Sequence, residues 1–150
     1  MQTVQKILKA KKGQGFIAIA PDATAYEALQ LMADKDIGAL LIVKDEKIAG
    51  IFTERDYARK VILKGKASKE TPVSELMTKN VYCVTPEHTI EQCESLMDEK
   101  HLRHLPVVEG DKPIGLLSIR DVVNMIISER ENKIKELEGY ITGTNYVQED

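Results

Sequence analysis

Tryptophan is absent from this 150-residue chain, and phenylalanine and tyrosine together make up only 5% of it. Proteins that bind single-stranded nucleic acid stack bases on aromatic side chains, so this scarcity argues against that class of function. The formal net charge of −3 likewise provides no general basic surface for nucleic acid or an anionic membrane. Any anion that binds this protein must therefore bind at a local site.

Long apolar runs are also missing. No stretch approaches the length of a membrane span, and the opening residues, M-Q-T-V-Q-K-I-L-K, contain no signal-type apolar segment. We therefore expect a cytoplasmic protein without membrane contact.

Cysteine occurs only twice, at Cys83 and Cys93, without C-x-x-C spacing. Without a secretion signal, two such thiols are expected to stay reduced. His101 and His104 are possible metal ligands, but they precede a strand and do not share a helix face, so we predict no metal site. We also predict no enzyme, because the chain lacks a nucleophile–base pair and a phosphate loop of Walker or Rossmann spacing.

What the chain does contain is an internal repeat. The segment G-I-F-T-E-R-D, Gly50–Asp56, returns 65 residues later as G-L-L-S-I-R-D, Gly115–Asp121, and the same offset holds without a gap from Pro21 and Pro86 onward. Neither copy, at about 60 residues, would bury a comfortable core alone. The predicted fold is α/β (α+β), with two β-α-β-β-α repeats packed about a pseudo-twofold axis and an extended C-terminal helix.

Hydrophobic periodicity and turn residues give the expected limits of the repeats. Residues 1–65 are predicted to form repeat 1, 66–72 the linker, 73–138 repeat 2 and 139–150 a loose tail. The elements expected in repeat 1 are an amphipathic turn at Val4–Ala10, a strand at Phe16–Ala20, a helix capped by Thr24, strands at Ala39–Val43 and Lys47–Phe52, and a helix after Thr53 whose apolar face carries Tyr57, Ala58, Val61 and Ile62. In repeat 2, His104–Val108 is expected to be a buried strand.

The last helix is predicted to be long, because its apolar pattern continues to Leu137 before Gly139 is expected to stop it. Its second half has no counterpart in repeat 1. An apolar stripe outside the core suggests contact with a partner, and the alternative is that it docks on its own module.

Two interpretations of the repeated motif are open. Thr53–Asp56 and Ser118–Asp121 both fit a capping box, in which a hydroxyl and an acid satisfy the first amides of a helix. However, Arg55 and Arg120 place a cation at the positive end of the helix dipole, which capping does not require. A bound anion would explain all three residue types, since the donors can hold phosphate while the carboxylate accepts from sugar hydroxyls.

These motifs, together with Asp36–Leu41 and Leu102–Val108, resemble a tandem pair of CBS domains, which form a Bateman module. The resemblance covers about Val4–Glu138, and the segments T-E-R-D-Y-A-R-K, K-G-K-A-S and L-E-G-Y-I-T-G are similar to the small stand-alone bacterial type. The resemblance implies a non-catalytic regulatory sensor that binds AMP, ADP, ATP or NAD(H) in the cleft between its domains. It also implies a homodimer and a regulated effector protein that the sequence does not identify.

Two alternatives accompany this expectation. One is binding of S-adenosylmethionine. The other, from a different class of function, is a structural dimerisation module with empty clefts, in which the motif residues act only as helix caps.

The resemblance also implies roles for individual residues. The acid of each motif, Asp56 or Asp121, would accept from the ribose hydroxyls, and Thr53 or Ser118 would lie near the ribose or phosphate. The base would lie against apolar residues of each repeat, which are Ile17, Ile19 and Ile37 in repeat 1 and Tyr82, Val84 and Leu102 in repeat 2.

Phosphate donors are implied across the repeats. In the gamma subunit of the AMP-activated kinase, a His-Arg pair reaches the phosphate of a nucleotide whose ribose is held by the other repeat, and Arg103 and His104 match that pair. Arg120 is expected to join them at the Asp56 site. The Asp121 site is expected to draw chiefly on Arg55, because Gly38-Ala39 occupies the equivalent of the basic pair. The two clefts are therefore predicted to be unequal, with the tighter site at Asp56.

Overall fold

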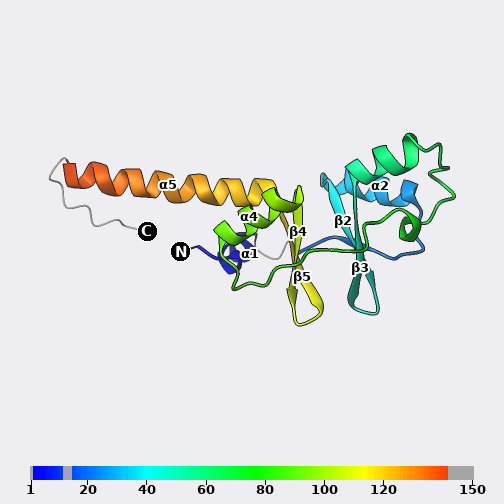
Figure 1. The fold of residues 1–150 in the computed structure, drawn as a ribbon, viewed down its shortest axis with the longest axis horizontal. Helices are drawn as coiled ribbons and strands as arrows, with labels where there is room; N and C mark the ends of the chain where they lie inside the picture. Colours follow the sequence, from blue (N-terminus) through cyan, green and yellow to red (C-terminus); the bar gives the residue numbers. More distant parts are fainter. Residues whose placement is uncertain (1, 12–14, 142–150) are drawn as a thin grey trace.

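The computed structural model describes residues 2–11 and 15–141, in which two small sheets lie side by side and one long helix projects beyond them (Figure 1). The first half of the chain contains α1 (Val4–Ala10), β1 (Ala18–Ile19), α2 (Ala25–Lys35), β2 (Ala39–Lys44), β3 (Lys47–Thr53), the single turn α3 (Glu54–Asp56) and a π-helical turn, η1 (Tyr57–Ile62). The second half contains a 3₁₀ turn, η2 (Val73–Glu75), α4 (Ile90–Lys100), β4 (His104–Glu109), β5 (Lys112–Ser118) and α5 (Ile119–Ile141). None of the described helices is both long and apolar enough to span a bilayer.

The repeat predicted from the sequence is present in the strand pairing. β2 pairs antiparallel with β3, and β4 pairs antiparallel with β5. Each hairpin has an irregularity in its register at the same place, between Ile42 and Val43 in one and between Val107 and Val108 in the other. The mixed α/β fold with two repeated units and a long C-terminal helix is therefore confirmed.

β2 is buried on both faces, as its continuous apolar run predicts. Leu40 and Ile42 point into the core of repeat 1, whereas Ala39 and Leu41 belong to a separate apolar cluster that also includes Leu116 of the other sheet. Side chains alternate between the two faces of a strand. The same strand therefore builds one core and also the contact between the two sheets.

The first strand of each repeat is shorter than predicted. Phe16–Ala20 is reduced to β1, which runs parallel to β2, and its equivalent in repeat 2 is only an isolated bridge between Val84 and Val107. Pro21 and Pro86 follow two residues after the last paired position in each repeat. Because proline has no amide hydrogen to donate, the ladder cannot continue through it.

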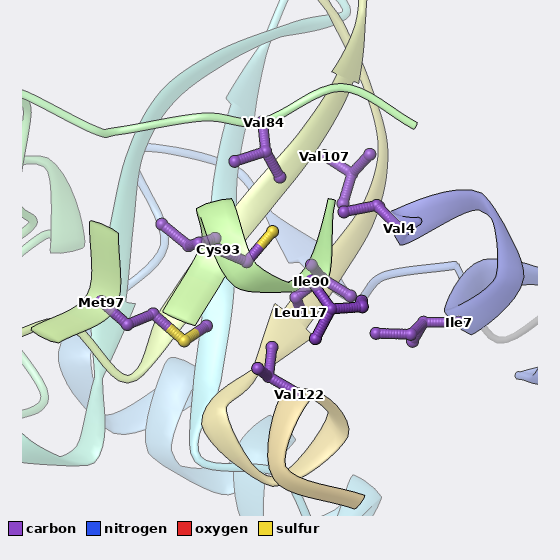
Figure 2. Packing of buried hydrophobic residues seen from close by; sticks show 10 residues of the cluster. Val4, Ile7, Val84, Ile90, Cys93, Met97, Val107, Leu117 and Val122 are labelled. Carbon is purple, nitrogen blue, oxygen red and sulfur yellow. The ribbon is translucent and has the colours of Figure 1, made fainter. Parts of the chain in front are cut away.

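The leading segments of the two repeats are exchanged. Val4 and Ile7 of α1 pack in the core of repeat 2, beside residues of α4, β4, β5 and α5 (Figure 2). In turn, Val73 and Leu76 pack in the core of repeat 1. The backbone follows the same exchange, since the Val4 amide donates to the carbonyl of His88 at 2.9 Å. Each hydrophobic core is therefore completed by the other repeat.

The turn after the first motif is wound differently from the prediction. The Leu63 amide donates to the carbonyl of Ala58 at 3.1 Å, a π-type bond across five residues. Val61 is fully buried, but Ile62 is 62% exposed, so the prediction that both lie on one apolar face is wrong. Ala58, which was predicted on the same face, is also exposed.

The prediction that α5 stops at Gly139 is wrong. The helix continues to Ile141. Glycine ends a helix when it takes a positive φ, and the glycines that do so in the described residues are Gly65 and Gly110. In the second half of α5, Ile134 and Leu137 are 54% and 51% exposed, so this apolar stripe is not docked on its own module. The rest of the predicted tail, residues 142–150, lies outside the described residues.

Candidate functional site

A cavity of about 470 Å³ lies where the two repeats meet, beside the first motif. Its size is in the range of pockets that hold small molecules. Both repeats contribute to its wall, which consists of Gly38, Ile51, Thr53, Glu54, Arg55, Asp56, Thr78, His101, Leu102, Arg103 and His104. Five of the predicted ribose- and phosphate-binding residues are thus brought together, three from repeat 1 and two from repeat 2.

The first motif forms a complete capping box. The Asp56 amide donates to Thr53 Oγ1 at 3.1 Å, and Asp56 Oδ2 accepts from the Thr53 amide at 3.0 Å and from its hydroxyl at 3.1 Å. The other oxygen, Oδ1, lies 3.2 Å from Lys60 Nζ. With only 14% of its side chain exposed, Asp56 is held at the cavity wall with both oxygens engaged.

The second motif forms an equivalent helix cap, and a different lysine pairs with its acid. The Ser118 amide donates to Asp121 Oδ2 at 2.8 Å, and the Asp121 amide donates to Ser118 Oγ at 3.2 Å. Lys11 Nζ lies 2.8 Å from the same carboxylate oxygen and donates to the carbonyl of Leu116 at 2.9 Å. The capping interpretation of both motifs is therefore confirmed, and any ligand that uses these carboxylates must share or displace a lysine.

The part of the cavity wall that repeat 2 contributes begins at a sharp turn at the end of α4. His101 has a left-handed backbone, with φ of 56°, which ends the helix and leads through Leu102 and Arg103 into β4. His104, the first residue of β4, is paired across the sheet with Ser118. It thus stands between the second motif and the cavity of the first.

The surroundings of His104 shift the pKa of its imidazole. Burial lowers its pKa below the ordinary value of 6.5. The Asp121 carboxylate opposes this shift, while the cations of Lys11 and Arg103 add to it. At neutral pH the imidazole is therefore uncharged, and it offers one N–H donor to a ligand.

The positions of the two motif arginines differ from the prediction, in which each binds phosphate at the site of the other repeat. Arg55 lines the cavity beside its own Asp56, whereas it was expected to serve the Asp121 site. Arg120 is exposed and does not belong to the wall of this cavity. Arg55 also lines a groove between α4 and α5 of repeat 2, so its side chain lies at the interface between the two repeats.

The predicted base-pocket residues are not gathered in one place. Leu102 lines the cavity at Asp56, while Ile17, Ile19 and Ile37 are partly buried against the core of repeat 1. In repeat 2, Val84 is 1% exposed within the core and has no surface for a base. Tyr82 is 44% exposed, and Lys100 Nζ lies 5.3 Å from the centre of its ring. Of the six residues, Leu102 alone joins the ribose and phosphate residues at this cavity.

Sequence reasoning missed the two lysines. Lys60 follows Asp56 by four residues, so its helical spacing could have indicated the ion pair. Lys11 had no such signal, because it lies 110 positions before Asp121 and reaches that residue only through the exchange of α1.

The two cysteines are free, with Cys93 buried and Cys83 partly buried. Burial raises the pKa of Cys83, and burial together with the Glu91 carboxylate raises the pKa of Cys93 to about 11. Both thiols are therefore protonated at neutral pH. Within residues 2–11 and 15–141, no group of three or more histidine, cysteine or acidic side chains is placed to hold a metal ion.

Comparison with known proteins identifies the family. The CBS domain model matches residues 14–63 and 73–128, one match for each repeat. The chain belongs to the CBS-domain family. This CBS-domain pair is 36% identical over 149 residues to the mitochondrial CBS domain-containing protein CBSX3 of Arabidopsis thaliana, covering 94% of this chain and 72% of CBSX3.

Solved structures agree with this assignment. A CBS-domain protein from Burkholderia ambifaria MC40-6 superposes with a TM-score of 0.81 at 48% identity, covering 85% of this chain and 95% of that one. The CBS domain pair of protein MJ0100, solved in complex with 5′-methylthioadenosine and S-adenosyl-L-methionine, superposes with a TM-score of 0.75. It is 21% identical and covers 86% of this chain and 98% of its own, so the likeness concerns the fold alone.

Proposed function

We propose that this CBS-domain pair is a non-catalytic regulatory module that binds an adenine nucleotide in the cavity beside Asp56. The observation that carries the proposal is the composition of the cavity wall, in which Thr53 and Asp56 of one repeat face Arg103 and His104 of the other. The ligand class is AMP, ADP, ATP or NAD(H).

Each part of such a ligand has a chemical match in the cavity. The Asp56 carboxylate can accept from a ribose diol, and Thr53 adds a hydroxyl beside it. Arg55 and Arg103 supply guanidinium groups, which bind phosphate with charge-assisted hydrogen bonds. Leu102 and Ile51 supply apolar surface for the base.

Calorimetry with AMP, ATP and NAD tests the proposal, with adenosine and GTP as controls. A ligand that binds only the folded protein, present at a hundred times its dissociation constant, should stabilise it by about 2.7 kcal/mol, which a melting curve detects. Adenosine should bind weakly because it lacks phosphate. If none of the three nucleotides binds at millimolar concentration, the proposal is wrong.

A structural dimerisation module is the second candidate, and one observation favours it. Both motif carboxylates are already satisfied by a helix cap and a lysine, so the motifs have a role without any ligand. S-adenosylmethionine remains an alternative ligand, because the MJ0100 pair is in complex with it. Including it in the same titrations separates all three possibilities.

We also propose a homodimer that uses the exposed second half of α5. Ile134 and Leu137 are about half exposed, and with Ile127 and Ile141 they form one exposed apolar stripe at helical spacing along α5. Replacing both by serine should lower the mass seen by light scattering at micromolar concentration, while Lys133→Ser with Lys135→Ser should not. A wild-type protein that is monomeric at that concentration would remove this part of the proposal. The regulated effector protein and the cytoplasmic location remain predictions.

A further inference from the structure

The ammonium group of Lys11 lies at the second motif where the first motif has a backbone amide. In repeat 1, Thr78 bridges the edge of β3, since its amide donates to the carbonyl of Ile51 at 2.9 Å and its carbonyl accepts from the Ile51 amide at 3.0 Å. The equivalent residue of β5, 65 positions later, is Leu116. Its amide donates to the carbonyl of Gly15 at 3.1 Å, and its carbonyl accepts from Lys11 Nζ at 2.9 Å. A side-chain cation therefore replaces the donor that Thr78 provides in repeat 1.

This replacement brings a charge to a position that belongs to the cavity wall in repeat 1. Ile51 and Thr78 both line the cavity beside Asp56. At the second motif, the ammonium group of Lys11 takes the place of the Thr78 amide and also reaches Asp121 Oδ2 at 2.8 Å. The acid of the second motif is therefore paired with a cation on the side that corresponds to the cavity.

The lysine at the first motif is placed differently. Lys60 follows Asp56 by one helical turn and pairs with its Oδ1 atom, but Lys60 is not part of the cavity wall. The equivalent position in repeat 2 is Met125, which carries no charge. The second motif thus has no cation from its own helix and receives one from α1. A ligand in the cavity can approach Asp56 without meeting Lys60, whereas a ligand that approaches Asp121 in the same way meets Lys11.

Lys11 and a sugar would use the same acceptor. A ribose diol binds a carboxylate by donating from its hydroxyls, and an ammonium group is also a donor, with a full positive charge in addition. The side chains of Lys11 and Asp121 are only 28% and 20% exposed, so water and salt screen their attraction in part. Lys11 is also tethered, because Val4 and Ile7 of α1 are buried in the core of repeat 2 (Figure 2). The internal cation therefore competes well with a neutral diol.

We propose that Lys11 is an autoinhibitory residue, which occupies Asp121 from within the chain and prevents the second motif from accepting sugar hydroxyls. This inference rests on the proposed function, in which the equivalent acid, Asp56, accepts from a ribose. In the resting protein only one of the two motif acids is then available to a ligand. A ligand gains Asp121 only when Lys11 leaves it, and because Lys11 directly follows α1, that step also frees the end of the segment that completes the core of repeat 2.

Calorimetric titration of the full chain with AMP tests this assignment. The wild type should bind one equivalent, and Lys11→Met should bind two, with affinities within about tenfold of each other. Methionine has a similar length but cannot donate to the acid or neutralise it. Lys6→Met is the matched control, since Lys6 is an exposed cation on α1, and this variant should bind one equivalent. Adding Asp121→Ala to Lys11→Met should remove the gained equivalent, whereas adding Asp56→Ala should leave it in place. A cooperative melting transition of each variant shows that it is folded.

Each other outcome has a definite meaning. A wild type that binds two equivalents, or a Lys11→Met variant that binds one like the wild type, would overturn the assignment while leaving the proposed function in place. A second equivalent in Lys6→Met would also overturn it, because a general loss of positive charge would then be the cause. If the wild type binds no AMP but Lys11→Met binds one equivalent that Asp121→Ala removes, the proposed function fails and the autoinhibitory contact stands. If neither protein binds AMP, both fail.

Discussion

The side-chain nitrogen of Lys11 lies 2.8 Å from the carboxylate of Asp121. Lys11 follows α1, the segment that completes the core of repeat 2, so a cation from one repeat neutralises the motif acid of the other. In repeat 1, Lys60 pairs with Asp56 and donates to the carbonyl of Leu76 in the other exchanged segment, at 2.9 Å. Each motif acid is thus linked to an exchanged segment by one lysine.

The first prediction concerns the strength of this link. Lys11→Met should destabilise the protein by about 1 kcal/mol, because the pair is only 28% and 20% exposed and is screened less than a surface pair. A double-mutant cycle with Asp121→Asn, measured by urea unfolding, should give a coupling of similar size. The control cycle, Lys133→Met with Glu136→Gln, involves an exposed pair at 3.9 Å and should give almost none. A coupling no larger than that of the control would mean that the contact does not stabilise the fold.

The second prediction is that the two motif acids are unequal in binding. Asp56 lines the 470 Å³ cavity with Arg103 and His104, whereas Asp121 is held by Lys11 and does not line that cavity. Asp56→Ala should therefore remove the tight calorimetric phase for AMP, and Asp121→Ala should leave it largely intact. The opposite result would place the tight site in repeat 2.

The third prediction tests the contribution across the repeats. Arg103→Ala should weaken the phase that Asp56→Ala removes, by at least about tenfold, since a charge-assisted hydrogen bond contributes on the order of 1.5–3 kcal/mol. Arg120→Ala is the matched control, because Arg120 is exposed and lies outside the wall of that cavity. A larger effect of Arg120 than of Arg103 would show that the phosphate lies on the other side of the interface.

The fourth prediction concerns the glycine at the same place in each repeat. A Cβ added to Gly50 would lie 2.7 Å from the sulfur of Met77 and 2.8 Å from the backbone oxygen of Thr78. A Cβ at Gly115 would lie 2.6 Å from a terminal methyl of Leu8 and 3.6 Å from the backbone oxygen of Gly15. Gly50→Ala should therefore cost about 1–3 kcal/mol of unfolding free energy, and Gly115→Ala clearly less, because a leucine methyl can rotate away. Equal losses in urea unfolding would contradict this ranking.

The sequence predicted the repeated hairpins of this fold but not the exchange of its leading segments. The offset of 65 located both hairpins and both motifs, because an internal repeat and a continuous apolar run report directly on burial. The exchange of Val4–Ile7 and Val73–Leu76 was not predictable. Their apolar pattern specifies that a face is buried, but both cores present an equivalent docking surface, so the pattern does not say in which core.

Site residues were predictable to the extent that they lie within the motifs. Thr53, Asp56 and Arg103 were identified from the repeated pattern and the family resemblance, and they do line one cavity. Val84 was assigned to a base pocket through the family resemblance, whereas the structure places it 1% exposed in the core of repeat 2. Whether the residues at this cavity bind a nucleotide stays a prediction.

The last prediction is a pH dependence of stability that comes from His104. Its pKa in the folded protein is lowered below 6.5, chiefly by burial, whereas the unfolded chain has the ordinary value. As the pH falls below about 6.5, the unfolded state therefore takes up a proton that the folded state resists, and stability falls with a slope of at most about 1.4 kcal/mol per pH unit. Above that pH the contribution is fully present. Urea unfolding between about pH 7.5 and 5.5 should show this loss in the wild type and in the exposed His101→Gln control, but not in His104→Gln. If His104→Gln loses stability as steeply as the wild type, the acid sensitivity arises from other groups, and the buried imidazole is not its source.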